Sequence, residues 1–109
     1  MIMKKRAPRP SRKVRYAVVG LGHIAQNAVL PAFEHASRNS VLSALVSDDP
    51  IKRRRLGKRY KVPALFGYDA FDEMLAADLV DAVYIALPNS LHRAYAERAA
   101  MHGVHILCE

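Results

Sequence analysis

The sequence predicts an α/β fold, a doubly wound parallel sheet in which short strands alternate with amphipathic helices. Short runs of β-branched and aliphatic residues recur along the chain, and longer runs with helical spacing of apolar residues separate them. A length of 109 residues is enough for one domain with one core. Strands that alternate with helices pair in parallel through right-handed crossovers, so about five strands should form a single sheet.

The expected elements follow one another with short connections. Strands are expected at residues 14–20, 41–47, 64–66, 81–87 and 104–108. Helices are expected at residues 23–36, 50–60, 70–77 and 90–102. Asp49 and Asp69 should cap the second and third helices, and Gly103 should end the fourth in a left-handed conformation. Pro31 lies inside the first helix and predicts a kink near residues 29–32, because its ring clashes with the preceding turn.

The positive charge of the chain is concentrated at its beginning. Residues 1–13 hold six of the 17 basic residues and no acidic residue, so the remainder is almost neutral despite a total net charge of +7. Pro8 and Pro10 interrupt this segment, which also lacks apolar periodicity, and both features predict a flexible basic N-terminal arm. No recognition motif accompanies the arm, which argues against nucleic acid as its partner.

The sequence also indicates a compartment. The basic segment has no separate apolar stretch or cleavage site, so it is a poor secretory signal. No apolar run approaches the ~20 residues of a membrane-spanning helix, and a cytoplasmic protein without membrane contact is therefore expected. The single cysteine, Cys108, agrees with a reducing compartment and should pack inside the last strand rather than react. No spacing of cysteine and histidine suggests a metal site.

The turn between the first strand and the first helix has the spacing of a dinucleotide-binding motif. Residues 16–26 read YAVVGLGHIAQ, in which Gly20, Gly22 and Ala25 match the pattern G-x-G-x-x-G/A. The first glycine permits a tight turn, the second lets the backbone approach a pyrophosphate, and the alanine allows close packing of helix against strand. The start of the helix favours an anion. The alternative is that the glycines only turn a strand into a helix. The predicted cofactor contacts here are Gly20, Gly22, His23, Ile24 and Ala25.

The end of the second strand bears on the type of cofactor. An acidic residue there binds the ribose hydroxyls of NAD, whereas domains that bind NADP replace it and supply cations for the 2′-phosphate. The strand ends in ALVSDDPIKRRR. If Ser47 takes the acidic position, its hydroxyl together with Lys52 and Arg53, one turn away, favours NADP. If Asp48 faces the ribose instead, its charge favours NAD. The other basic residues of this helix are expected to form a solvated face.

Several segments of the chain resemble one family of enzymes. These are VRYAVVGLGHIAQNAVLPAF, LSALVSDDPIKRRRLGKRYKVP, YDAFDEML, VDAVYIALPNSLH and AERAAMHGVHILCE, which together cover nearly everything after residue 13. They resemble the N-terminal Rossmann domain of the Gfo/Idh/MocA oxidoreductases, and most closely the glucose–fructose oxidoreductase-like members. The resemblance implies that residues 14–109 form a Rossmann domain that binds NADP, with NAD as the alternative cofactor.

The resemblance also assigns roles to individual residues. It implies that Ser47 and Lys52 hold the 2′-phosphate of NADP and that Tyr68 lies near the adenine end of the cofactor. It further implies that Leu87, Pro88, Asn89 and His92 lie near the nicotinamide half of the cofactor. Together with Arg53 and Glu109, the predicted cofactor-binding residues beyond the glycine turn are then Ser47, Lys52, Arg53, Tyr68, Leu87, Pro88, Asn89, His92 and Glu109.

The chain also departs from the family pattern. Family members continue beyond the position of Glu109 into Lys-Pro, whose lysine is a proposed catalytic residue, and then into a large α/β substrate domain. Neither is present here, so no catalytic residue is predicted and the Rossmann domain is expected to be incomplete.

The sequence therefore predicts an NADP(H)-binding domain or fragment of an oxidoreductase that acts on a CH–OH group of a sugar or polyol. We expect it not to be catalytic alone, because a substrate would bind only in a full-length form, and a homo-oligomer is compatible with it. Two alternatives remain open: a stand-alone NAD(P)-binding regulatory module, and a nucleic-acid-binding protein that uses the basic arm.

Overall fold

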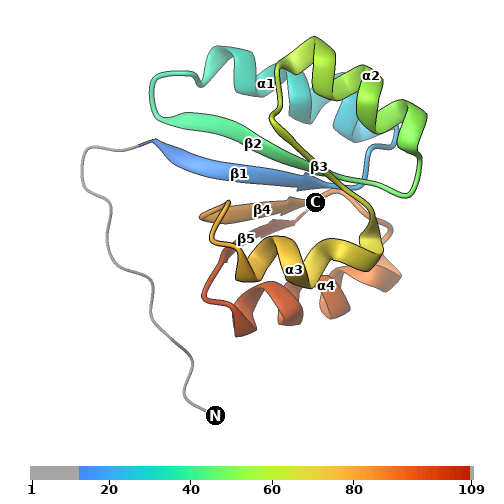
Figure 1. Cartoon of the computed structure of the whole chain (residues 1–109), viewed down its shortest axis with the longest axis vertical. Helices are drawn as coiled ribbons and strands as arrows, with labels where there is room; N and C mark the ends of the chain where they lie inside the picture. Colours follow the sequence, from blue (N-terminus) through green and yellow to red (C-terminus); the bar gives the residue numbers. More distant parts are fainter. Residues whose placement is uncertain (1–12, 109) are drawn as a thin grey trace.

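The chain forms a five-stranded parallel sheet with helices on both of its faces (Figure 1). The computed structural model describes residues 13–108, so nearly all of the predicted basic arm, and the predicted cofactor contact Glu109, lie outside the described residues. The strands pair in the order β3-β2-β1-β4-β5. They are β1 Val14–Val19, β2 Ser40–Val46, β3 Ala64–Phe66, β4 Ala82–Ile85 and β5 His105–Cys108.

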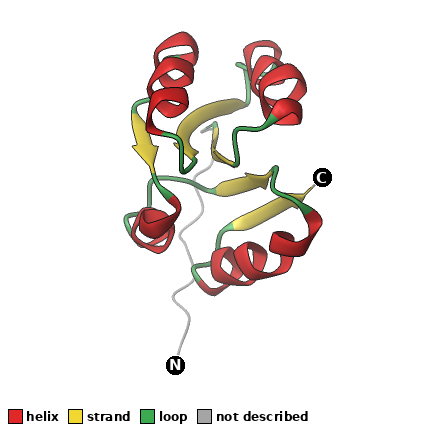
Figure 2. Cartoon of the chain, turned by 90° about the vertical axis from the view of Figure 1, so that its right-hand side faces the viewer, coloured by secondary structure: helices red, strands yellow, loops and turns green. Residues whose placement is uncertain are grey.

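The helices cover opposite faces of the sheet in two pairs. α1 and α2 lie on one face, and α3 and α4 lie on the other, which confirms the doubly wound architecture (Figures 1 and 2). Within residues 13–108, no helix combines the length and the apolar composition that crossing a bilayer requires. The helical elements are η1 Ala25–Val29, α1 Leu30–His35, α2 Pro50–Tyr60, η2 Tyr68–Ala70, α3 Phe71–Ala76 and α4 Asn89–Met101.

Two apolar cores, one on each face of the sheet, hold the layers together. On the side of α3 and α4, the fully buried Phe71 and Met74 pack against the strands. On the side of α1 and α2, Leu30 and other buried residues form a second cluster. Because successive side chains of a strand point to opposite faces, Val19 of β1 belongs to the first core and Val18 to the second. Burial on both faces explains why these strands are continuous apolar runs rather than alternating ones.

The surroundings of the last strand differ from those predicted. Among the described residues β5 pairs only with β4, and Cys108 is exposed, so the prediction that this cysteine packs inside its strand is wrong. A strand at the edge of a sheet has a neighbour on one side only, which leaves its end open to solvent.

On the face of α1, an apolar groove of about 500 Å³ runs beside the helix, and Phe33, Tyr84 and Leu107 line part of it.

Local signals at the helix ends are confirmed in two places and wrong in one. The carboxylate of Asp49 accepts a hydrogen bond from the Lys52 backbone N–H (3.0 Å) and caps α2, and Gly103 has the left-handed φ of 71° that ends α4. Asp69 does not cap α3, because a 3-10 turn over Tyr68–Ala70 precedes that helix and no side-chain cap hydrogen bond is formed.

The first helix is irregular one turn earlier than predicted. Its π-helical turn spans Ala25–Val29, where the Leu30 N–H donates to the Ala25 carbonyl, and regular α-helix follows it through Pro31. A proline ring clashes with the carbonyl four residues earlier in an α-helix. The wider π turn relieves this clash before the proline is reached.

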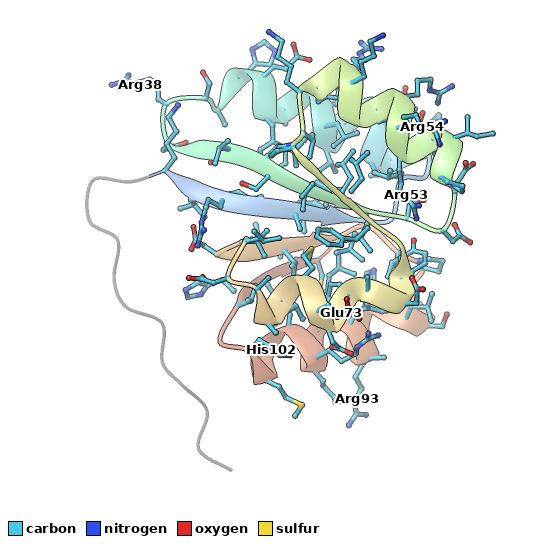
Figure 3. All side chains as sticks on the ribbon, viewed as in Figure 1. Arg38, Arg53, Arg54, Glu73, Arg93 and His102 are labelled. Carbon is cyan, nitrogen blue, oxygen red and sulfur yellow. The ribbon has the colours of Figure 1, made fainter. Side chains whose placement is uncertain are left out.

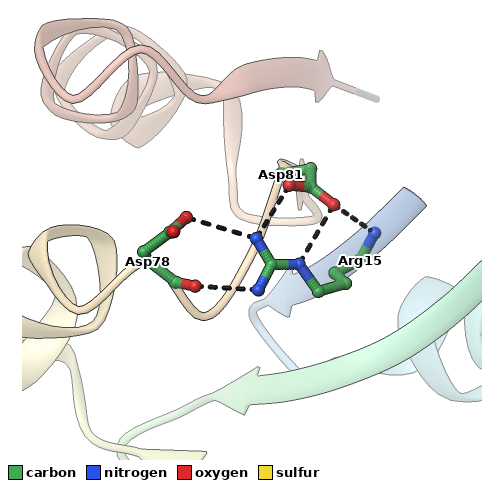
Figure 4. Close-up of polar contacts among 3 residues, drawn as sticks. All are labelled: Arg15, Asp78 and Asp81. Carbon is green, nitrogen blue, oxygen red and sulfur yellow. Dashed lines mark hydrogen bonds and ion pairs between the residues drawn. The ribbon is translucent and has the colours of Figure 1, made fainter. Parts of the chain in front are cut away.

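A charged cluster ties β1 to the loop between α3 and β4 at the end of the sheet opposite the cofactor motif (Figure 4). The Asp81 carboxylate accepts hydrogen bonds from the Arg15 backbone N–H (2.8 Å), Nε (3.1 Å) and Nη2 (2.9 Å). Arg15 also donates to the Asp78 carbonyl (2.8 Å), and Asp78 has a left-handed φ of 56°. The carboxylate of Asp81 raises the pKa of the Arg15 guanidinium. This cluster stabilises the fold without touching the candidate site.

Candidate functional site

The described residues assigned to a cofactor site lie in the loops that follow β1 to β4 and in the first turns of the helices after these loops, at the carboxyl edge of the sheet. Backbone hydrogen bonds join neighbouring strand ends: Gly20 N donates to Val46 O (2.8 Å), and Ser47 N donates to Phe66 O (3.0 Å). β1 pairs with β2 on one side and with β4 on the other, so the loops diverge at the end of β1. Open α/β sheets bind ligands at such a switch point.

Gly20, the residue after β1, is required by the fold itself. Its φ is +95°, a conformation that side chains rarely adopt, and an added Cβ would lie 2.8 Å from the Ala86 carbonyl oxygen and 2.9 Å from Leu87 Cδ2. The absence of a side chain therefore lets the first turn approach the loop after β4 closely.

Gly22 has no such requirement. Its φ is not positive, and an added Cβ would meet no atom of the described residues within 4 Å. Turn formation therefore accounts for Gly20 but not for Gly22. The space beside Gly22 is open to solvent and could admit a ligand against the backbone. Ala25, by contrast, is 1% exposed and packs in the core beneath the helix.

Gln26 holds the glycine turn in place. Gln26 Nε2 donates to the Leu21 carbonyl (2.9 Å), and the Gln26 backbone N–H donates to the Gly22 carbonyl (3.1 Å). The backbone N–H groups of His23 and Ile24 lie in the first helical turn, where a helix leaves its amides without intrahelical acceptors. Sequence reasoning missed Gln26, although its place right after the motif was a usable signal.

The end of β2 presents Ser47 rather than a carboxylate. Ser47 is the first residue after the strand and is 4% exposed, and its Oγ accepts a hydrogen bond from the Asp49 backbone N–H (3.2 Å). Asp49 itself serves α2, and the hydrogen bond from the Lys52 backbone N–H lowers the pKa of its carboxyl. Asp48, between them, is exposed.

Arg53 reaches from α2 to the ends of β2 and β3. Its Nη1 donates to the Ser47 carbonyl, whereas Arg54, the next residue, is exposed on the outer part of the helix (Figure 3). A Cβ added to Gly67, just after β3, would lie 3.2 Å from Arg53 Nη1 and 2.7 Å from Asp69 Oδ1. The guanidinium therefore lies against the bare backbone of Gly67. Sequence reasoning missed Gly67, because nothing local marks it.

Tyr68 lies next to Gly67 on the same edge. It is half-buried, and its ring contacts that of Tyr95 at a centroid distance of 5.8 Å. Burial raises the pKa of the Tyr68 hydroxyl, and the negative charge of Asp48 raises it further.

The loop after β4 places the residues assigned to the nicotinamide half. Leu87 is 9% exposed and packs against the core beside Gly20, while Pro88 and Asn89 are exposed at the start of α4. His92 Nε2 pairs with the Leu87 carbonyl, so the ring is fixed to the loop. Pro88 and Asn89 are thus the residues of this loop that a ligand can reach most directly.

Comparisons with known proteins show similarity to a family of oxidoreductases. Residues 14–109 match the sequence model of a family described as an oxidoreductase family with an NAD-binding Rossmann fold. The D-xylose 1-dehydrogenase (NADP(+)) 2 of Haloferax volcanii is 32% identical over 86% of this chain and 28% of its own length.

Solved structures show the same similarity. The aldose-aldose oxidoreductase from Caulobacter crescentus, complexed with glycerol, has 41% sequence identity and a TM-score of 0.82, covering 89% of this chain and 29% of that one. A 3-ketoreductase from Actinomadura kijaniata, in complex with TDP-benzene and NADP, has 34% sequence identity and a TM-score of 0.77. The similarity covers 89% of this chain and 29% of that one. The chain thus spans less than a third of the length of these relatives.

Proposed function

Because the chain belongs to the Gfo/Idh/MocA family of oxidoreductases and comprises its NAD-binding Rossmann fold, we propose that it is the NADP(H)-binding part of an enzyme that oxidises or reduces a CH–OH group of a sugar or polyol. The observation that carries the choice of NADP is the end of β2, where buried Ser47 stands in place of a carboxylate and Arg53 lies against its carbonyl. A 2′-phosphate needs hydroxyl donors and cations at this point, and an unmodified ribose needs an acid.

The glycine turn binds the pyrophosphate. The open space beside Gly22 gives the phosphates access to the backbone, and the first-turn amides, with those of His23 and Ile24 among them, donate to phosphate oxygens. Gly20 and Ala25 bind indirectly, because they hold the turn against the loop after β4 and the helix against the sheet.

The adenosine half of the cofactor binds where β2 and β3 end. The Ser47 hydroxyl already accepts a hydrogen bond from Asp49 N and so can donate its own proton to a phosphate oxygen. Lys52 and Arg53 supply positive charge, and Tyr68 flanks the adenine end. Charge-assisted hydrogen bonds of this kind are stronger than neutral ones.

The nicotinamide end lies at the loop after β4, beside Leu87, Pro88, Asn89 and His92. The cofactor supplies the hydride donor or acceptor of the reaction when it is bound. Hydride transfer also needs a substrate held in contact with the nicotinamide. The relatives carry more than two thirds of their length outside the matched region, and we assign the substrate site and the catalytic residues to such a region. The 109 residues alone then bind cofactor without turnover.

Isothermal titration calorimetry of the 109-residue chain with NADPH and with NADH tests this function. The wild-type chain should bind NADPH more tightly than NADH. Ser47→Asp should reverse the preference, because a carboxylate repels the 2′-phosphate and accepts hydrogen bonds from ribose hydroxyls. Ser90→Asp, on the exposed start of α4, is the matched control and should leave the NADPH/NADH ratio unchanged. A folded chain that binds neither dinucleotide would contradict the proposal.

A further inference from the structure

The structure points to a second determinant of cofactor choice, one that need not touch the cofactor. Arg53 lies in α2, six residues after Ser47 in the sequence. A long side chain on a helix surface can adopt many orientations in solvent. Instead, Arg53 Nη1 donates to the Ser47 carbonyl, so one end of the planar group is fixed at the end of β2. Arg53 carries five N–H donors, and one bond to a main-chain carbonyl leaves the others for a ligand.

The guanidinium has room in this position because residue 67 has no side chain. An ideal Cβ on Gly67 would be 3.2 Å from Arg53 Nη1, closer than most Cβ contacts, and 2.7 Å from Asp69 Oδ1. The backbone of Gly67 does not itself require glycine, because its φ is −82°. The missing side chain therefore serves the neighbouring side chains and not the conformation of the loop.

Both atoms that a Cβ would meet are the ends of flexible side chains. A substitution at this position should thus displace Arg53 and Asp69 at little cost to the fold. Nothing else among the described residues holds the Arg53 guanidinium by a hydrogen bond or an ion pair, so its position depends on the Ser47 carbonyl and on the space over Gly67.

We infer that Gly67 is a positioning residue for NADP specificity, because it leaves the space in which Arg53 is fixed at the 2′-phosphate side of the site. The inference rests on the proposed function, since it assigns the end of β2 to the adenosine 2′-phosphate. Arg53 supplies charge and N–H donors to the phosphate, and Gly67 acts only through Arg53. An unphosphorylated ribose gains nothing from this arrangement, so NADH affinity is independent of it.

A double-mutant cycle on the 109-residue chain tests the inference. The measured quantity is the ratio of NADPH affinity to NADH affinity, determined by calorimetry for each variant. Arg53→Ala should lower the ratio by roughly tenfold, as expected for loss of a charge-assisted hydrogen bond. Gly67→Ala should lower it by about threefold or more, with NADH affinity and the melting temperature unchanged. In the Arg53→Ala background, Gly67→Ala should have no further effect on the ratio.

The neighbouring carboxylate needs its own control, because a Cβ at residue 67 also displaces Asp69. In an Asp69→Ala background only the Arg53 contact remains, and Gly67→Ala should still lower the ratio. Loss of the effect there would assign it to Asp69 and overturn the inference, as would additive effects of Gly67→Ala and Arg53→Ala. A wild-type chain that prefers NADH or binds no dinucleotide refutes the proposed function instead, so the two failures are distinguishable.

Discussion

The two glycines of the motif should respond to the same substitution in opposite ways. Gly20→Ala forces a side chain into a φ of +95° and places its Cβ 2.8 Å from the Ala86 carbonyl oxygen. Left-handed strain costs about 1–2 kcal/mol and overpacking about 1–3 kcal/mol. Unfolding free energies of small domains are about 5–15 kcal/mol, so a loss of roughly 2–5 kcal/mol is a large share of the total.

Gly22→Ala adds the same methyl group to open space. Among residues 13–108, no atom beyond the adjacent residues lies within 4 Å of the new Cβ, and φ is not positive, so the folded state tolerates the methyl group. Replacing glycine at a compatible position reduces the entropy of the unfolded chain and stabilises by about 0.4–1 kcal/mol. The methyl group does, however, occupy the space assigned to the pyrophosphate, so NADPH affinity should fall by roughly tenfold, or about 1.4 kcal/mol.

Thermal unfolding followed by circular dichroism, with calorimetric NADPH titration, separates the two effects. At about 4–8 °C per kcal/mol for a domain of this size, Gly20→Ala should lower Tm by roughly 10 °C or more. Gly22→Ala should leave Tm equal to or slightly above that of the wild type and still weaken NADPH binding. A Gly22→Ala chain that melts as early as Gly20→Ala, or that binds NADPH with wild-type affinity, would refute the assignment of Gly22 to ligand clearance.

Three further outcomes are expected. Asp81→Asn should lower the unfolding free energy by roughly 1–3 kcal/mol in urea titration, because the carboxylate accepts three hydrogen bonds from Arg15, while Asp78→Asn, at 71% exposed, should cost under about 1 kcal/mol. The pKa of Asp72 is lowered by its hydrogen bond from Arg98, so the stability it contributes is present above the unfolded pKa of about 3.9 and is lost as pH falls below it. The stability difference between wild type and Asp72→Asn, measured by urea titration, should therefore shrink as pH falls below about 3.9 and through the lower pKa of the folded state. A difference that does not change between pH 7 and strongly acidic pH would contradict this. Removal of residues 1–13 should leave NADPH affinity unchanged in calorimetry, since the proposed cofactor contacts begin at Gly20; a large loss would place part of the site in that segment.

Local sequence signals predicted the order of elements well because each depends on neighbouring residues. Asp49 followed by Pro50 marks the start of α2, where the carboxylate caps the Lys52 amide and the proline lacks an N–H that would need a partner. Gly103 ends α4 for a similarly local reason. Asp69 shows the limit of this approach, because the same residue type lies within a 3-10 turn and caps nothing.

Only part of the candidate site could be predicted from local sequence signals. The spacing of Gly20, Gly22 and Ala25 is local and was read directly from the chain. The spacing also gave the two glycines different roles, but it did not show that Gly20 lies against the loop after β4, because that loop is more than 60 residues away in the sequence. The role of Gly67 was not predicted for the same reason, since Arg53, which lies beside it in space, belongs to another element.

The sequence alone thus determined the α/β class, the strand-turn-helix motif at Gly20 and the helix ends that a single side chain or a glycine specifies, because these depend on contacts between near neighbours. The tertiary structure decided which strand lies at the edge, leaving Cys108 exposed, and it brought Arg15 to Asp81 across 66 residues of chain. It also placed Arg53 between Ser47 and Gly67. Sheet order creates these contacts, and parallel pairing brings together strand ends that no local pattern can relate.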